Sequence, residues 1–277
     1  MNPPRQELII EAGRTEQQYW RDLWNYRELF YILAWRDIMV RYKQTVIGIA
    51  WAVIRPFLTI VVFTLVFHRV AKLEAPGGVP YALFVSVALM PWQFFASAFS
   101  EASGSLLSNS GLISKVYFPR LIVPAGSVIT SLVDFAITLG MLAVLMVWYQ
   151  FAPDWRILTL PLFILQAFAA ALGAGLLLCA LNVKYRDFRY VVPFIVQFGL
   201  YVSPVGFGSE RVPQYLRWLY DLNPMVGVIE GFRWACLKGV SPLELRTVAS
   251  SWLVTVAMCA LGIWYFRRTE KTFADVI

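Results

Sequence analysis

Six apolar stretches, each long enough to cross a lipid bilayer, occupy most of this chain of 277 residues. They cover residues 46–67, 81–100, 121–149, 157–181, 190–205 and 248–266. About 20 helical residues, rising roughly 1.5 Å each, cross the hydrocarbon core of a bilayer, and a helix satisfies its own backbone hydrogen bonds where no water is present. Hydrophobic residues make up 59% of the sequence. We therefore predict an all-α integral membrane protein with six transmembrane helices.

The lysines and arginines predict how these helices are oriented. Seven lie before residue 46, two in residues 101–120, three in 183–189 and three after residue 266. The two short loops on the other side hold only three together, and the segment between the fifth and sixth stretches holds five. Cytoplasmic loops carry an excess of positive charge, so both termini are expected in the cytoplasm. The predicted parts are a cytoplasmic N-terminal segment 1–45, a transmembrane domain 46–266 and a cytoplasmic tail 267–277. The net charge of +7 then needs no nucleic acid to explain it.

Residues 18–44, before the first stretch, mix aromatic and charged side chains and are too polar to cross a membrane. Tryptophan and tyrosine prefer the headgroup level, while arginines reach phosphate and water. We expect an amphipathic interface helix lying on the cytoplasmic face. A soluble helix that packs on a partner protein is the alternative.

Two connections are more than simple loops. Residues 101–120 are polar but carry a short apolar stripe, which a partner protein or the ends of neighbouring spans must cover; the stripe and its neighbours are Leu106, Leu107, Leu112, Ile113, Lys115, Val116 and Tyr117. Residues 203–246 are expected outside, yet 225–237 are largely apolar and too short to cross as a helix. Prolines punctuate this region, which favours short re-entrant outer helices.

Signatures of catalysis are missing from the sequence. No Gly-Lys dipeptide occurs, so the phosphate-binding GxxxxGK[ST] loop is absent, and the single histidine, His68, has no HExxH motif around it. The chain is therefore not expected to be an enzyme or to bind a cofactor or metal itself. Any ATP that drives it must be hydrolysed elsewhere.

Charge inside the predicted spans is limited to Arg55 and Asp134. A charge at the centre of a membrane helix costs roughly 2.5 to 3.5 kcal/mol on insertion scales, so each should be paired or face an aqueous path. Arg55 could extend to the inner headgroups, or contact an anionic lipid headgroup or a diphosphate. Asp134 could pair with an arginine.

Aromatic residues lie at helical spacing within the second and fifth spans: Trp92, Phe94, Phe95, Phe99, Phe194, Phe198 and Tyr201. Packing is the default interpretation of such residues. The alternative is a channel lining that stacks on sugar faces.

Several short motifs follow one another in a characteristic order along the chain. They are residues 35–51 (WRDIMVRYKQTVIGIAW), Arg55-Pro56, residues 116–120 (VYFPR), residues 181–190 (LNVKYRDFRY), Ser203-Pro204, and residues 222–225 (LNPM) before Arg233. In this order they resemble the six-span membrane subunits of type-2 ATP-binding-cassette exporters of polysaccharides, as in O-antigen, teichoic acid and capsule export. The resemblance runs nearly end to end.

The resemblance implies partners and sites. Two copies would form a channel in the bacterial cytoplasmic (inner) membrane, each docked through a coupling helix within 106–117 to a separate ATPase subunit that holds ATP and Mg. The cargo would be a polyprenyl-diphosphate-linked polysaccharide, with Arg36, Arg41, Lys43 and Arg55 near its diphosphate at the inner entrance. An exporter of drugs or small lipids is the alternative within transport, and a membrane scaffold or enzyme of glycan assembly is the alternative outside it.

Overall fold

The computed structural model describes residues 16–43, 48–185 and 187–273, and within these ranges it is all-helical, without strands. The α-helices are α1 (Glu16–Asn25), α2 (Arg27–Lys43), α3 (Gly48–Phe63), α4 (Tyr81–Ser108), α5 (Ser110–Ile113), α6 (Ile122–Trp148), α7 (Leu160–Lys184), α8 (Phe188–Val202), α9 (Arg217–Tyr220), α10 (Pro224–Cys236) and α11 (Leu245–Thr269). The predicted fold class is confirmed in its helical character.

Five of the six predicted spans are helices long and apolar enough to cross a membrane. They are Ala50–Val70, Tyr81–Ser108, Ile122–Trp148, Trp155–Lys184 and Leu245–Thr272. The first continues from α3 into a π-helical segment, Thr64–Val70, and the fourth begins with a 3₁₀ turn before α7.

The remaining predicted span, the fifth in chain order (residues 190–205), is the shorter helix α8 of 15 residues. At 1.5 Å per residue it is about 22 Å long, less than the hydrocarbon core requires of a straight span. The helix ends at Val202, because Ser203 precedes Pro204 and a residue before proline is driven out of the helical region into extended backbone.

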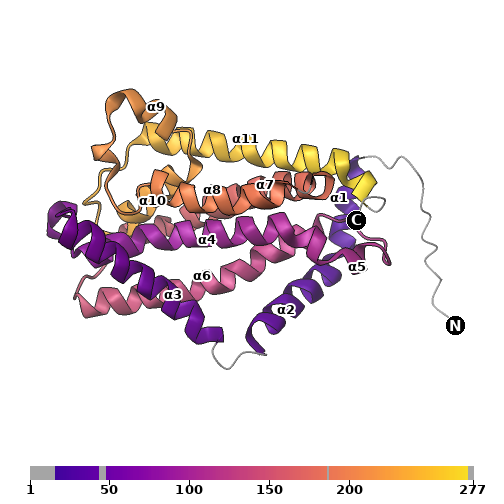
Figure 1. Ribbon diagram of the computed structural model, residues 1–277, viewed down its shortest axis with the longest axis horizontal. Coiled ribbons are helices and arrows are strands. Elements are labelled where there is room, and N and C mark those ends of the chain that lie inside the picture. The colour runs from indigo at the N-terminus through magenta and orange to yellow at the C-terminus, as the bar shows by residue number, and fades with distance from the viewer. Residues whose placement is uncertain (1–15, 44–47, 186, 274–277) are drawn as a thin grey trace.

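Helix α4 is the centre of the bundle, and most of its side chains are buried. It packs against α6 on one side and α7 on the other, and α7 in turn packs against α11 (Figure 1). Glycines permit the closest approach between α7 and α11: a Cβ on Gly262 would stand 2.2 Å from the carbonyl oxygen of Gly173.

The bundle has two different ends, which we name after their helices. At the α5 end lie α1, α5 and the last turns of α11; at the α10 end lie α9 and α10 (Figure 1). Helix α10 has only 13 residues, nearly all buried, and begins at Asn223, whose side chain accepts a hydrogen bond from the Met225 amide. Short helices were expected in this region because of its prolines.

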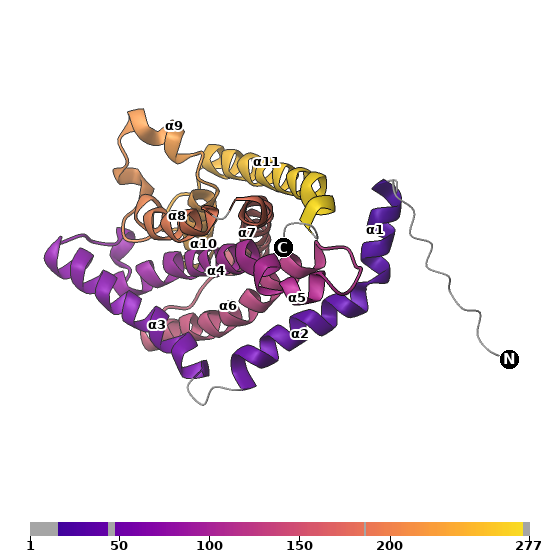
Figure 2. The ribbon, with the colours of Figure 1, turned by 45° about the vertical axis from the view of Figure 1, so that its right-hand side comes forward.

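The segment before α3 differs from the single helix expected over 18–44. It forms two helices, α1 and α2, separated at Tyr26. Helix α2 lies along α6, where Leu33 and Ala34 are its buried residues, and α1 turns away from it (Figure 2). Residues 1–15, which the predicted N-terminal segment includes, lie outside the described part of the chain.

Candidate functional site

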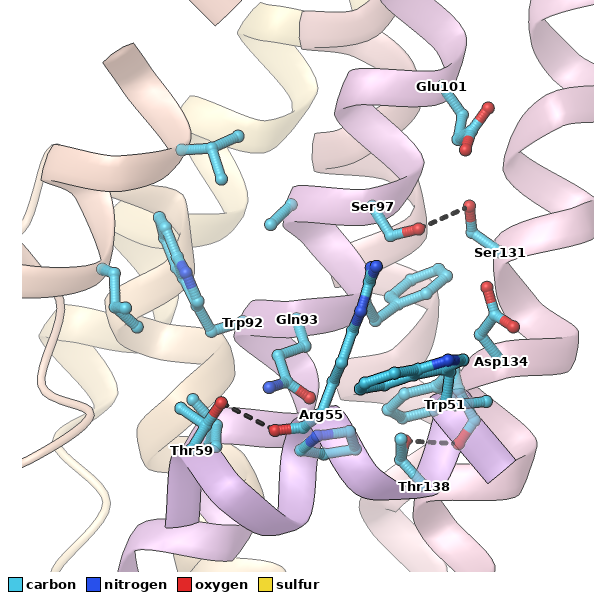
Figure 3. A pocket seen from close by; sticks show the side chains of 18 of the residues that line it. Trp51, Arg55, Thr59, Trp92, Gln93, Ser97, Glu101, Ser131, Asp134 and Thr138 are labelled. Carbon is cyan, nitrogen blue, oxygen red and sulfur yellow. Dashed lines mark hydrogen bonds between the residues drawn. The ribbon is translucent and has the colours of Figure 1, made fainter. Parts of the chain in front are cut away.

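A cavity of about 640 Å³ opens between the end of α2 and helices α3, α4, α6 and α8. Figure 3 shows it from close by, with side chains of α3, α4 and α6 converging on it. Its walls combine aromatic rings, small hydroxyl groups and both positively and negatively charged side chains. Such a mixed lining suits an amphipathic ligand better than a purely apolar one.

Two polar stripes face this cavity from neighbouring helices. Gln93, Ser97 and Glu101 repeat every four residues along α4, while Ser131 and Asp134 line it from α6. The Ser97 and Ser131 hydroxyl oxygens lie 3.3 Å apart and join the two stripes. Residues four apart share one face of a helix, so the regular polar spacing within an apolar helix could have revealed this wall from the sequence.

Arg55 projects from α3 into the cavity (Figure 3). No hydrogen-bond or ion-pair partner for its guanidinium is found among the described residues, and its side chain is exposed. The Thr59 hydroxyl donates to the Arg55 carbonyl oxygen at 2.8 Å, within α3. Of the four predicted entrance cations, Arg55 is the one best placed to receive an anion.

Arg41 is held differently, by two carboxylates. Its Nη1 donates to Asp134 Oδ2 at 2.6 Å, and its Nη2 donates to Glu101 Oε1. The Tyr42 hydroxyl donates to the other oxygen of Asp134. Burial and this hydrogen bond raise the pKa of Tyr42 well above its ordinary value, so the hydroxyl remains a proton donor. The expectation that Asp134 pairs with an arginine is confirmed.

The remaining two predicted entrance cations lie outside this cavity. Arg36 pairs with Asp37 at 2.7 Å and donates to the Asn109 side-chain oxygen at 2.7 Å. Lys43 is exposed at the end of α2 and does not line the cavity. The structure thus brings Arg41 and Arg55 together and leaves Arg36 and Lys43 nearer the surface.

The predicted channel aromatics divide into three groups. Trp92 and Phe94 line the cavity. Phe95 and Phe99 are stacked on each other in the buried core, where packing explains them. The third group, Phe194, Phe198 and Tyr201, lies on the exposed face of α8 and does not line the cavity of this chain. Trp51 of α3 is a lining aromatic that the sequence interpretation did not select.

The predicted coupling stripe is partly covered within the chain. Leu106 and Ile113 are buried in a hydrophobic cluster at the α5 end, with Leu107 and Leu112 packed against it. Helix α4 continues to Ser108, so the first residues of the stripe belong to a long helix, and the neighbouring spans provide its cover. Of the two covers expected for the stripe, the neighbouring spans thus provide the one for Leu106 and Ile113. Lys115, Val116 and Tyr117 remain on the surface, where the resemblance places the partner.

A bundle of long apolar helices around an open amphipathic cavity defines a multi-pass membrane protein of the transporter type. Comparison with known families agrees: residues 28–237 match the model of the ABC-2 type transporter family. The chain belongs to this family, and the resemblance noted in its motifs is confirmed.

The relatives cover almost the whole chain. An O-antigen export system permease protein RfbA of Klebsiella pneumoniae is 24% identical over 90% of this chain and 95% of its own length. The protein of the same name in Myxococcus xanthus is 27% identical over 93% of this chain and 98% of its own. A capsule polysaccharide export inner-membrane protein CtrC of Neisseria meningitidis is 26% identical over 86% and 90%.

Proposed function

We propose that this chain is the channel-forming membrane subunit of an ATP-driven exporter that moves a polyprenyl-diphosphate-linked polysaccharide across the bacterial cytoplasmic membrane. Two copies would enclose the path, and two separate ATPase subunits would bind ATP and Mg. Family membership and the names of the relatives support the transport class and the polysaccharide branch.

The observation that carries the proposal is Arg55 in the amphipathic cavity. A lipid-linked glycan has an apolar tail, a diphosphate and hydroxyl-rich sugars, and the cavity offers a counterpart to each. The guanidinium of Arg55 can bind phosphate oxygens in a bidentate manner. Trp51 and Trp92 offer ring faces, and Gln93 and Ser97 offer hydrogen-bonding groups.

The test replaces Arg55 in cells that depend on this chain for export. We expect Arg55→Ala to lower surface polysaccharide by about tenfold or more, as expected for loss of a charge-assisted bidentate contact, and Arg55→Lys to keep an intermediate level. Lipid-linked polymer should accumulate inside the cell at the same time. Quantitative immunoblotting of surface and intracellular polymer measures both.

A matched control is Arg69→Ala, which removes an exposed arginine from the π-helical continuation of α3. Arg69 does not line the cavity, so its loss should leave surface polymer within about twofold of wild type. Unchanged export in the Arg55→Ala variant, at equal protein level, would contradict the assigned role. If polymer never forms when the chain is absent, the protein acts in synthesis instead.

A further inference from the structure

A second cavity, of about 550 Å³, adjoins the first between α2, α4 and α6. Its walls are mostly polar and include Arg36, Asp37 and Asn109. Arg41 and Glu101 are the two side chains that line both cavities. The ion pair between them therefore stands at the boundary, with the polar cavity on one side and the Arg55 cavity on the other.

Beyond Arg36, which donates to Asn109, the end of α2 is tied to α4 and α6 by this charged network. Leu33 and Ala34 are the buried residues of the helix, and none of its residues from 35 to 43 is buried. Arg41 instead bonds to a carboxylate of α4 and a carboxylate of α6, and Tyr42 bonds to the latter.

The network is accessible to a competing anion. The side chains of Arg41 and Asp134 are each 29% exposed, and that of Glu101 is 47% exposed. Ion pairs at this degree of exposure are worth little individually because water competes for both partners. A strong anion can therefore displace the carboxylates, whereas a fully buried pair would resist exchange.

We propose that the Arg41–Glu101–Asp134 network is a latch between the two cavities, and that it selects lipid headgroups carrying at least two negative charges. An entering headgroup must replace two carboxylates on the Arg41 guanidinium and then tolerate their repulsion. A diphosphate has enough charge and oxygen atoms for this exchange; the phosphodiester of an ordinary phospholipid has a single charge. The inference rests on the proposed function, because its ligand is the lipid diphosphate.

Exchange would have two consequences. The hydrogen bonds that tie the end of α2 to α4 and α6 would be lost, and this end of the helix would become more mobile because none of residues 35–43 is buried. The headgroup would also gain access to Arg55, the next cation along the path. The latch thus keeps phospholipids with a single negative charge out of the cavity while it admits the diphosphate.

The experiment measures hydrogen–deuterium exchange of residues 36–43 in the full-length protein, reconstituted in phosphatidylethanolamine nanodiscs. The probes are undecaprenyl diphosphate and, at equal mole fraction, phosphatidylglycerol. In the wild type we expect the diphosphate to accelerate exchange and phosphatidylglycerol to have no effect. Binding of each radiolabelled probe is measured in the same samples.

The informative variant is Asp134→Asn, which keeps the side-chain volume and removes one competing charge. We expect its half-saturating diphosphate concentration to fall about tenfold, equivalent to ~1.4 kcal/mol, and phosphatidylglycerol now to accelerate exchange. Glu101→Gln, at an exposed position that tolerates change, should shift both responses in the same direction. Asp154→Asn is the control, because it makes the same change in an Arg156 ion pair at the α10 end.

The outcomes separate the latch from the proposed function. If the wild type binds the diphosphate but exchange is unchanged, or if Asp134→Asn and Glu101→Gln leave the selectivity intact, the latch is wrong and the substrate assignment stands. If the wild type binds no diphosphate, both the latch and the proposed lipid-diphosphate substrate are wrong. A shift in Asp154→Asn equal to that in Asp134→Asn would also overturn the latch, because it would show a general charge effect.

Discussion

Arg233 is a charged residue in the core of the α10 end, with 1% of its surface exposed. Its two terminal nitrogens donate to the carbonyl oxygens of Val205 and Phe207, each at 3.0 Å. Its guanidinium also lies over the Phe84 ring of α4, 3.8 Å from the centroid. One side chain therefore fastens α10, α4 and the segment after α8 together. An arginine can do this because its planar guanidinium donates in two directions and stacks on a ring at the same time, whereas a lysine ammonium cannot stack in this way.

Glu230 lies one turn before Arg233 and accepts a hydrogen bond from Ser209. Burial raises the pKa of Glu230 to about 7, although the charge of Arg233 opposes the shift. The folded protein thus holds this proton at pH values where the unfolded chain, with a pKa near 4.5, has released it. The resulting stabilisation is present below that value and is lost as the pH rises through about 7.

We predict that the melting temperature of the purified protein falls between pH 5 and pH 8. The effect has an upper limit of about 3 kcal/mol, since one pKa unit corresponds to about 1.4 kcal/mol. Glu230→Gln, which cannot titrate, should flatten the profile over this interval. Thermal unfolding in detergent followed by tryptophan fluorescence measures it. An equal pH dependence in the variant and the wild type would assign the effect to other groups.

At the scale of elements, contact between helices depends on small residues. Helices α7 and α11 approach so closely that a Cβ on Gly173 would stand 2.7 Å from the Cys259 amide nitrogen. Without a strong hydrophobic effect between apolar helices in lipid, association depends on such close packing. The close packing of α7 and α11 therefore requires that Gly173 and Gly262 have no side chain.

Gly262→Ala should therefore destabilise the bundle by about 1–3 kcal/mol, because the added methyl group meets the Gly173 carbonyl and neither backbone can move freely. Gly140→Ala in α6 is the matched control, since a Cβ there has no neighbour within 4 Å. Thermal denaturation monitored by size-exclusion chromatography compares the two. Equal stability of both variants would show that the approach between α7 and α11 is not limiting.

At the scale of the whole molecule, we propose that the α5 end docks the ATPase subunit, as the resemblance implies for a coupling helix within 106–117. Val116 and Tyr117 are 49% and 54% exposed, just beyond α5, while Ile113 points into the hydrophobic cluster beneath them. A partner could contact the first two directly. Ile113 would affect docking only indirectly, by supporting the short helix.

We predict that Val116→Asp lowers the amount of ATPase subunit that copurifies with this chain by about tenfold, as for a charge placed at the centre of an interface. The expression and elution position of the chain itself should not change. Leu245→Asp, at an 82% exposed position at the start of α11, is the control at the opposite end. If the complex with the ATPase is retained in the Val116→Asp variant, the coupling surface does not include Val116 and lies elsewhere on the chain.

The sequence alone determined the helical membrane class and the positions of five long spans, because hydrophobic length is a local property that each segment carries by itself. Its motifs also identified the family. It also identified Arg55 and Asp134 as charges that are costly to place inside a membrane span and should therefore be paired or face an aqueous path, and both line the cavity.

Only the tertiary structure decided which residues share that cavity. Arg36 and Arg41 look equivalent in the sequence, but the structure separates them because the carboxylates that pair with Arg41 come from α4 and α6, far along the chain. Likewise, the sequence left open whether a partner protein or the neighbouring spans cover Leu106 and Ile113, and the structure shows that helices of the same chain cover them. Burial and pairing depend on contacts between distant segments, and local pattern does not encode those contacts.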